Sequence, residues 1–286
     1  MLFGVNVSTS AGPGSDPVAF ARRAEELGFD FVSASDHLHG GSPTNETWTM
    51  LSWIAARTTR IRVATRVLAT PYRNPAVVAK MAETLDRLSD GRLILGLGGG
   101  YADEEFRAFG LGERSAREKV DGMEEAVRIA RGLWSEGSFS FDGRLYRTEG
   151  AELEPKPERP IPIWLGTYGP RALAVTGRLA DGWIPTLELA PPERVTKMRD
   201  LVLAAAEEAG RDPGKITCVY NLDIRVDGEP DPLVVSGPPD AIAERLVEFT
   251  RLGFTAFNFL PVGADQEEQA ERLAREVIPA VRDAAA

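Results

Sequence analysis

The sequence predicts one closed barrel of eight parallel β-strands that alternate with helices, a (β/α)8 TIM barrel spanning residues 1–286. A length of 286 residues is long for an ordinary domain but typical of this barrel. Segments with strand and helix patterns alternate along the chain, and no linker divides it. Several expected strands are apolar throughout, as in parallel strands that are packed on both faces. An open eight-stranded sheet is the alternative fold.

Strands are expected at residues 2–6, 31–35, 61–66, 93–97, 163–165, 182–185, 216–224 and 256–260. Helix starts are marked at Asp16-Pro17 and Asn74-Pro75, where a capping residue precedes a proline at the first helical position. Apolar residues then recur at helical spacing from Val77 to Leu88. Gly28 and Gly253 stand where a helix passes into a strand, since glycine tolerates the left-handed conformation of such joints.

The stretch between Trp134 and Ile163 is too long for a simple connection between a helix and a strand. Its glycines predict a hairpin over residues 138–146 that turns at Asp142-Gly143, and its prolines predict an extended connector afterwards. The barrel is therefore expected to carry an insertion between its fourth and fifth strands. The insertion either lies beside the mouth of an active site or is a surface excursion without a role.

Composition narrows the classes of partner. The net charge of −10, with basic residues scattered along the chain, argues against nucleic acid. The sequence contains no run of about 18 apolar residues, so no membrane span is expected. The N-terminal segment lacks the pattern of a signal peptide. The single cysteine, Cys218, fits a reducing compartment. The expected location is the cytoplasm.

Reactive groups of such barrels collect at the carboxyl ends of the strands. The second expected strand ends in Ser35-Asp36-His37-Leu38-His39, which contains both histidines of the chain. An imidazole exchanges protons near neutral pH, so His37 with Asp36 beside it fits a proton-transfer device. A polar strand end that bonds only to its neighbours is the alternative. His37 and His39 also fit a metal site, but only carboxylates remain in the chain to complete it.

Two glycine-rich segments follow other strands. Gly96 to Gly100 is not a dinucleotide fingerprint, because Tyr101 stands where that motif needs a further glycine. The cluster predicts either close approach of the backbone to a flat group or a tightly packed strand exit. The second segment, which follows the fifth strand and opens a helix, predicts a cradle of backbone N–H groups for a phosphate or carboxylate, with an ordinary helix start as the alternative. Its residues are Gly166, Thr167, Tyr168, Gly169, Pro170, Arg171 and Ala172, of which Arg171 adds a nearby cation.

A series of short motifs runs along the chain: Ser35-Asp36-His37, Trp48-Thr49-Met50-Leu51, residues 55–62, Tyr72-Arg73-Asn74-Pro75, residues 85–92, residues 96–101, Glu154-Pro155-Lys156-Pro157, Ala180-Asp181-Gly182-Trp183 and residues 236–240. In their order and spacing, these motifs resemble the luciferase-like superfamily of FMN-dependent monooxygenases and of dehydrogenases that use the deazaflavin coenzyme F420. They extend over nearly the whole chain, which looks most similar to the F420-dependent branch.

The resemblance implies that an isoalloxazine-type ring lies at the carboxyl ends of the strands. It implies that Asp36 and His37 line the ring site and that a non-prolyl cis peptide between Arg66 and Val67 backs the ring. It also implies that Gly99, Gly100 and Tyr101 border the ring. The segment from Thr167 to Ala172 is implied to hold the cofactor phosphate.

The sequence therefore predicts an oxidoreductase that moves a hydride between C5 of F420 and a small organic substrate, with His37 as the first acid–base candidate and Tyr101 as the second. An FMN-dependent monooxygenase, a metal-dependent hydrolase and a non-catalytic cofactor-binding protein are the rivals. Sugar-phosphate dehydrogenases of the superfamily carry a glutamate where Tyr101 stands and a tryptophan near His39-Gly40-Gly41, so their reaction is not expected. The expected partners are a small substrate, a second copy in a homodimer and a cofactor-reducing enzyme.

Overall fold

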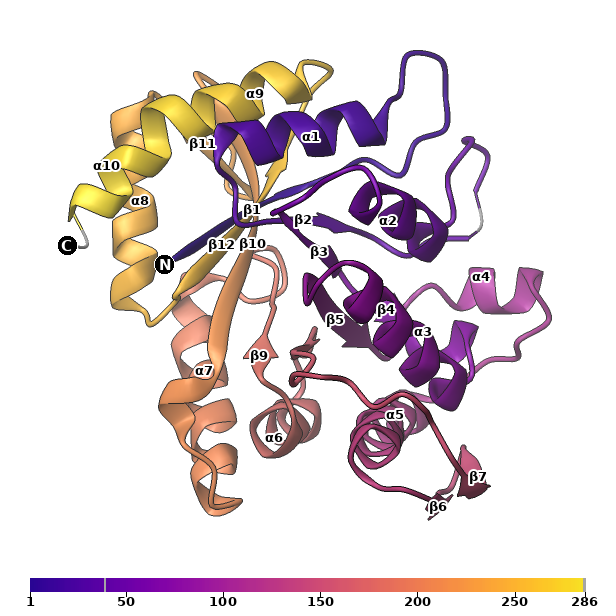
Figure 1. Ribbon diagram of the computed structural model, residues 1–286. Helices are drawn as coiled ribbons and strands as arrows, with labels where there is room; N and C mark the ends of the chain where they lie inside the picture. Colours follow the sequence, from indigo (N-terminus) through magenta and orange to yellow (C-terminus); the bar gives the residue numbers. More distant parts are fainter. Residues whose placement is uncertain (39, 285–286) are drawn as a thin grey trace.

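The computed structural model describes residues 1–38 and 40–284 (Figure 1). Within them, eight parallel strands form a ring in the order β1, β2, β3, β5, β8, β9, β10, β12. Pairing of Gly182 with Thr217 and of Phe3 with Phe257 closes that ring. The strands are β1 (Leu2–Asn6), β2 (Phe31–Ala34), β3 (Arg62–Thr65), β5 (Leu93–Gly98), β8 (Ile163–Leu165), β9 (Gly182–Trp183), β10 (Thr217–Val226) and β12 (Ala256–Pro261). The predicted barrel is confirmed, and the open sheet is wrong.

Two short strands extend this ring. β4 (Leu68–Ala69) follows β3 and pairs with β5, while β11 (Val234–Gly237) pairs with the second half of β10. The sixth predicted strand ends at Trp183 instead of residue 185, and Pro185 has no N–H to continue a ladder.

Helices surround the barrel (Figure 1). They are α1 (Pro17–Leu27), α2 (Thr47–Ala55), α3 (Pro75–Leu88), α4 (Asp103–Ala108), α5 (Ala116–Ser135), α6 (Pro170–Leu179), α7 (Pro192–Glu208), α8 (Pro239–Arg251), α9 (Gln266–Arg272) and α10 (Ile278–Ala284). Short helical turns lie at Thr70–Tyr72 (η1), Pro213–Lys215 (η2) and Leu273–Val277 (η3). The predicted caps form, since Asp16 accepts the N–H of Ala19 at 2.9 Å and Asn74 accepts that of Ala76 at 2.9 Å. Among the helices of the described residues, none has the length and apolarity to cross a membrane.

Side chains fill the barrel in layers. The layer nearer the amino ends of the strands is apolar, and in it the rings of Phe31 and Trp164 meet edge to face with their centroids 5.5 Å apart. The next residues along the strands make a buried polar layer: Ser33 donates to Asn258 at 2.9 Å, and Asn258 donates to Asn221 at 2.8 Å. This layer is satisfied internally. It forms the floor beneath the carboxyl ends of the strands.

The insertion between β5 and β8 contains the predicted hairpin, formed by β6 (Phe139–Asp142) and β7 (Arg147–Ala151). The second strand runs five residues beyond the predicted end at residue 146. In Figure 1 the hairpin lies beside α5. Glu125 of α5 accepts the backbone N–H groups of Arg144, Leu145 and Tyr146 at 2.7, 3.0 and 2.9 Å, so the turn is fixed to the barrel wall.

Candidate active site

His37 follows β2 at the carboxyl end of the barrel. Its Nδ1 lies 2.7 Å from a carboxylate oxygen of Glu105, a residue of α4. The second oxygen of that carboxylate accepts the N–H of Leu38 at 3.1 Å and the hydroxyl of Tyr72. The side chain of His37 is 35% exposed, whereas that of Glu105 is 6% exposed. A buried carboxylate therefore fixes a partly exposed imidazole.

The surroundings of Glu105 favour the ionised form of its carboxyl group. Burial raises the pKa of Glu105, but the hydrogen bonds from Tyr72, His37 and Leu38 outweigh it and hold the pKa of the carboxyl below its usual range. Burial and the bond to Glu105 raise the pKa of the Tyr72 hydroxyl, which remains a donor. A carboxylate can only accept, so Nδ1 of His37 carries the proton. In the neutral ring, Nε2 is then left as an acceptor.

Tyr101 lies against the other side of the imidazole. Its hydroxyl is 3.3 Å from Nε2 of His37, and the two rings meet edge to face with centroids 5.5 Å apart. Tyr101 is 80% exposed. The two predicted acid–base candidates are therefore brought together, with both functional groups accessible at the mouth.

Asp36 has a different environment from the one its position suggested. Its carboxylate is completely buried and makes a bidentate ion pair with Arg73 at 2.8 and 3.1 Å. The N–H of Ala69 bonds to it at 3.0 Å, and Arg73 also contacts Glu46, the cap of α2. The expected pairing of Asp36 with His37 is wrong, because the two side chains meet different partners and Glu105 takes that place. Asp36 holds the segment from β4 to α3.

The peptide bond between Arg66 and Val67 is cis, as the resemblance implied. Arg66 donates from Nε to the Asn6 side chain at 3.2 Å above the polar floor. Burial lowers the pKa of its guanidinium, and attraction to Asp223 opposes that effect. The site mouth thus contains a cation that no carboxylate contacts at ion-pair distance within the described residues.

Val67 explains part of the glycine pattern. A Cβ on Gly98 would lie 2.4 Å from one methyl group of Val67, and a Cβ on Gly166 would lie 3.3 Å from the other. A Cβ on Gly96 would lie 1.9 Å from the carbonyl oxygen of Thr65. Tight packing therefore accounts for these three glycines. Gly100 has a left-handed φ of 75°, and a Cβ there would lie 2.4 Å from the ring of Phe106.

The segment Gly166–Ala172 makes the predicted strand-to-helix turn. Thr167 is fixed by its hydroxyl, 2.7 Å from that of Thr176, and by its carbonyl, which accepts the indole N–H of Trp183 at 2.9 Å. Leu173 is the first residue of α6 whose N–H donates a backbone hydrogen bond, to the carbonyl of Gly169 at 2.9 Å. Within the described part of the chain, the N–H groups of Arg171 and Ala172 have no backbone partner, as expected at a helix start.

The remaining residues of this turn have their own contacts. Tyr168 packs over the barrel end, where its hydroxyl accepts the N–H of Thr186 at 3.2 Å. Pro170 is the first residue of α6, and the Arg171 side chain contacts Asp121 of α5. Whether the turn holds a phosphate stays a prediction.

The metal hypothesis depended on His39, which lies outside the described residues. In residues 1–38 and 40–284, no three or more of His, Cys, Asp and Glu gather as a metal site would require.

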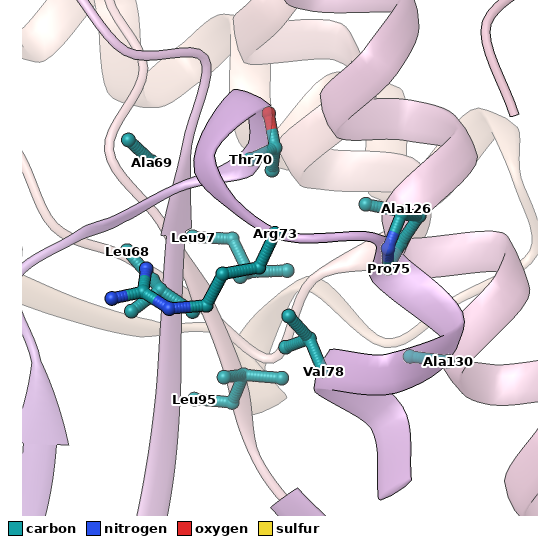
Figure 2. A pocket seen from close by; sticks show the side chains of 10 residues that line it. All are labelled: Leu68, Ala69, Thr70, Arg73, Pro75, Val78, Leu95, Leu97, Ala126 and Ala130. Carbon is teal, nitrogen blue, oxygen red and sulfur yellow. The ribbon is translucent and has the colours of Figure 1, made fainter. Parts of the chain in front are cut away.

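A small cavity lies behind the site, under η1 and between β4, β5, α3 and α5. Figure 2 shows its apolar lining and the Arg73 side chain, whose guanidinium points away from Pro75, Ala126 and Ala130. Its volume is about 10 Å³, so it holds one water at most. A cofactor ring needs far more room than this cavity offers.

Comparison with known proteins identifies the family of the chain. Residues 1–231 match the profile of the luciferase-like monooxygenase family. The chain belongs to this family. An F420-dependent glucose-6-phosphate dehydrogenase of Kineococcus radiotolerans is 30% identical to this luciferase-like protein, with 92% of each chain covered. One of the same name from Microbacterium testaceum is 28% identical, with 99% of this chain and 98% of the relative covered.

Solved structures of the luciferase-like fold superpose closely. An F420-dependent secondary alcohol dehydrogenase in complex with an F420-acetone adduct has a TM-score of 0.87 at 23% identity, with 99% of each chain covered. A long-chain alkane monooxygenase has a TM-score of 0.83 at 13% identity, covering 100% of this chain and 92% of its own. At such identities the likeness establishes the barrel fold alone.

Sequence reasoning missed Glu105, the partner of His37 in this luciferase-like barrel. The available signal was the acidic run Asp103-Glu104-Glu105 that opens a helix after the glycine cluster. Of these three side chains only Glu105 is buried, and the sequence does not mark which carboxylate faces inward. Tyr72 and Arg73 belong to the motif Tyr72-Arg73-Asn74-Pro75, whose contacts the sequence does not indicate.

Proposed function

We propose that residues 1–286 form one barrel domain of a cytoplasmic oxidoreductase that transfers a hydride between C5 of coenzyme F420 and a small organic substrate. The observation that carries the proposal is the set Glu105, His37 and Tyr101 at the barrel mouth. It occurs in a chain 30% identical, over 92% of its length, to an enzyme named as F420-dependent.

The residues present fit this cofactor. We assign its ring to the mouth bordered by Val67, Gly99, Gly100 and Tyr101, and its phosphate to the turn from Thr167 to Ala172. Free N–H groups and the positive end of the α6 dipole suit an anion there. When bound, the cofactor would accept or give the hydride.

The protein's part is proton handling and orientation. We assign Nε2 of His37 to take the hydroxyl proton of an alcohol substrate as its carbon loses a hydride, which leaves a carbonyl product. In the reverse direction the same nitrogen returns the proton. Glu105 stabilises the resulting imidazolium through Nδ1 at 2.7 Å. Tyr101 is the second candidate for this role. Reduction of a C=C or C=N substrate would also need a proton donor at this position.

Glucose 6-phosphate is not the substrate that we propose. The curated relatives bear that name, but the sugar-phosphate dehydrogenases that this chain resembles carry a glutamate where this chain has Tyr101. A phenol 3.3 Å from His37 cannot supply the charge of a carboxylate. We propose a small alcohol or its carbonyl partner instead.

Binding of oxidised F420 and of FMN, followed separately by the change in cofactor fluorescence, tests the proposal. We expect F420 to bind at least about tenfold more tightly than FMN. Tight binding of FMN with no measurable binding of F420 would contradict the proposal and favour the monooxygenase alternative.

We also propose that the enzyme is a homodimer that packs through the groove between α2 and α3. This groove has a volume of about 370 Å³ and is lined mainly by apolar side chains, including Met81, Leu85 and Leu88. Leu88 and Val77 at its edge are 76% and 55% exposed. Clustered exposure of this kind marks an interaction surface.

The dimer predicts that Leu88→Asp lowers the mass measured by light scattering to that of one chain. A buried unpaired carboxylate in the interface would be too costly to retain. Leu201→Asp on α7, where the parent side chain is 45% exposed, is the control and should leave the mass unchanged. A parent protein that is already monomeric at micromolar concentration would refute the interface.

A further inference from the structure

The turn of the inserted hairpin is firmly attached to the barrel. Three of its backbone N–H groups bond to Glu125, as described above. The hydroxyl of Tyr146 donates to the carbonyl of Thr70 at 2.9 Å and accepts from Arg114 at 2.8 Å. These bonds fix the backbone from which the Arg144 side chain extends, and that side chain has no part in the proposed proton transfer.

Arg144 belongs to a cluster assembled from three elements. Arg117 of α5, Arg144 of the hairpin and Arg171 of α6, here called the arginine cluster, surround the carboxylate of Asp121. Nη1 of Arg144 lies 3.2 Å and Nε of Arg117 lies 3.7 Å from that carboxylate, which Arg171 also contacts. The hydrogen bond from Arg171 holds the pKa of Asp121 below its usual value.

The arginine cluster has donors to spare. Each guanidinium has five N–H donors, and all three share Asp121, with Glu118 as a distant second partner 3.8 Å from Arg144. The side chains of Arg117, Arg144 and Arg171 are 74%, 53% and 51% exposed, whereas that of Asp121 is 12% exposed. In a chain of net charge −10, this local excess of positive charge favours an anionic ligand.

The position of the cluster indicates which anion. Arg171 is the second residue of α6, so the cluster begins at the turn assigned to the cofactor phosphate. Arg117 and Arg144 continue it outward over α5 and the hairpin. An anion that extends beyond the phosphate would therefore meet them in succession. F420 has this form, because a chain of glutamate carboxylates follows its phosphodiester, whereas FMN ends at its phosphate.

We propose that the arginine cluster binds the oligoglutamate tail of F420 and that the insertion serves to hold Arg144 in this site. The proposal rests on the function proposed above. Planar guanidinium groups bind carboxylates with two parallel hydrogen bonds, so arginine suits such a tail better than lysine does.

The test compares F420 that carries several glutamates with F420 that carries none, in the parent enzyme and in Arg144→Gln. Dissociation constants are measured by fluorescence titration at low and high salt. Because the substitution leaves the backbone bonds to Glu125 intact, we expect the hairpin to remain folded. It should weaken binding of the tailed cofactor about 3- to 10-fold and leave the tailless form unchanged. High salt should reduce the advantage of the tail.

Arg147→Gln is the matched control, since it makes the same change on the same hairpin where the arginine contacts Asp142 and not the cluster. It should leave both dissociation constants unchanged. Equal binding of the two cofactor forms by the parent enzyme would overturn the inference and leave the proposed function intact. Equal weakening of both forms by Arg144→Gln would also overturn it. If neither form binds, the proposed function fails as well.

Discussion

His37→Ala is expected to lower the rate of hydride transfer by about 10² to 10⁴-fold, the usual contribution of a general acid–base group. The imidazole is fixed through Nδ1 by Glu105, which directs Nε2 toward the mouth. Affinity for the cofactor should change much less, because the phosphate and ring contacts that we propose come from other strands. Stopped-flow absorbance of F420 measures the rate, and a titration measures the affinity.

His39→Ala, which changes the only other histidine of the chain, is the matched control and should leave the rate unchanged. If His37 only hydrogen-bonds the ring, the dissociation constant of His37→Ala will change while the rate stays within about threefold of the parent. That result would end the acid–base assignment of His37. Tyr101→Phe would then be the next variant to measure.

Arg73→Met is expected to reduce the free energy of unfolding by about 3–5 kcal/mol, because it leaves Asp36 buried without its partner. The carboxylate of Asp36 has no exposed surface, and only 15% of the Arg73 side chain is exposed. Urea unfolding at pH 7, followed by circular dichroism, measures the loss.

Arg128→Met is the comparison, because Arg128 makes an exposed pair with Glu124 on α5; it should cost no more than about 0.5 kcal/mol. The double variant Asp36→Asn with Arg73→Met should recover part of the loss, since no buried charge then remains. A loss below about 1 kcal/mol in Arg73→Met would show that water reaches Asp36 and that the pair does not hold the segment.

The fold was predictable because its signals are local. Capping residues such as Asp16 and Asn74 mark helix starts through bonds to residues two or three positions away. Apolar runs such as residues 93–97 mark buried parallel strands whatever their partners are. The bounds of the sixth strand and the hairpin were less accurate, because pairing partners far along the chain decide where a ladder stops.

The site was predictable only in part, because its contacts join distant residues. His37 and Glu105 are 68 positions apart, and no local pattern distinguishes Glu105 from the two acidic residues before it. Adjacency in sequence suggested Asp36 instead, yet its carboxylate reaches Arg73, 37 positions away. The glycine pattern was ambiguous for the same reason, since Gly98 and Gly166 both make room for Val67.

A crystal structure of the enzyme with oxidised F420 bound tests the central claim most directly. We expect the phosphate to contact the backbone N–H groups between Thr167 and Ala172 and the ring to lie against Val67, within hydrogen-bonding reach of His37 or Tyr101. A phosphate that lies more than one helix away from this turn, or a ring bound outside the mouth bordered by His37, would contradict the proposed cofactor site.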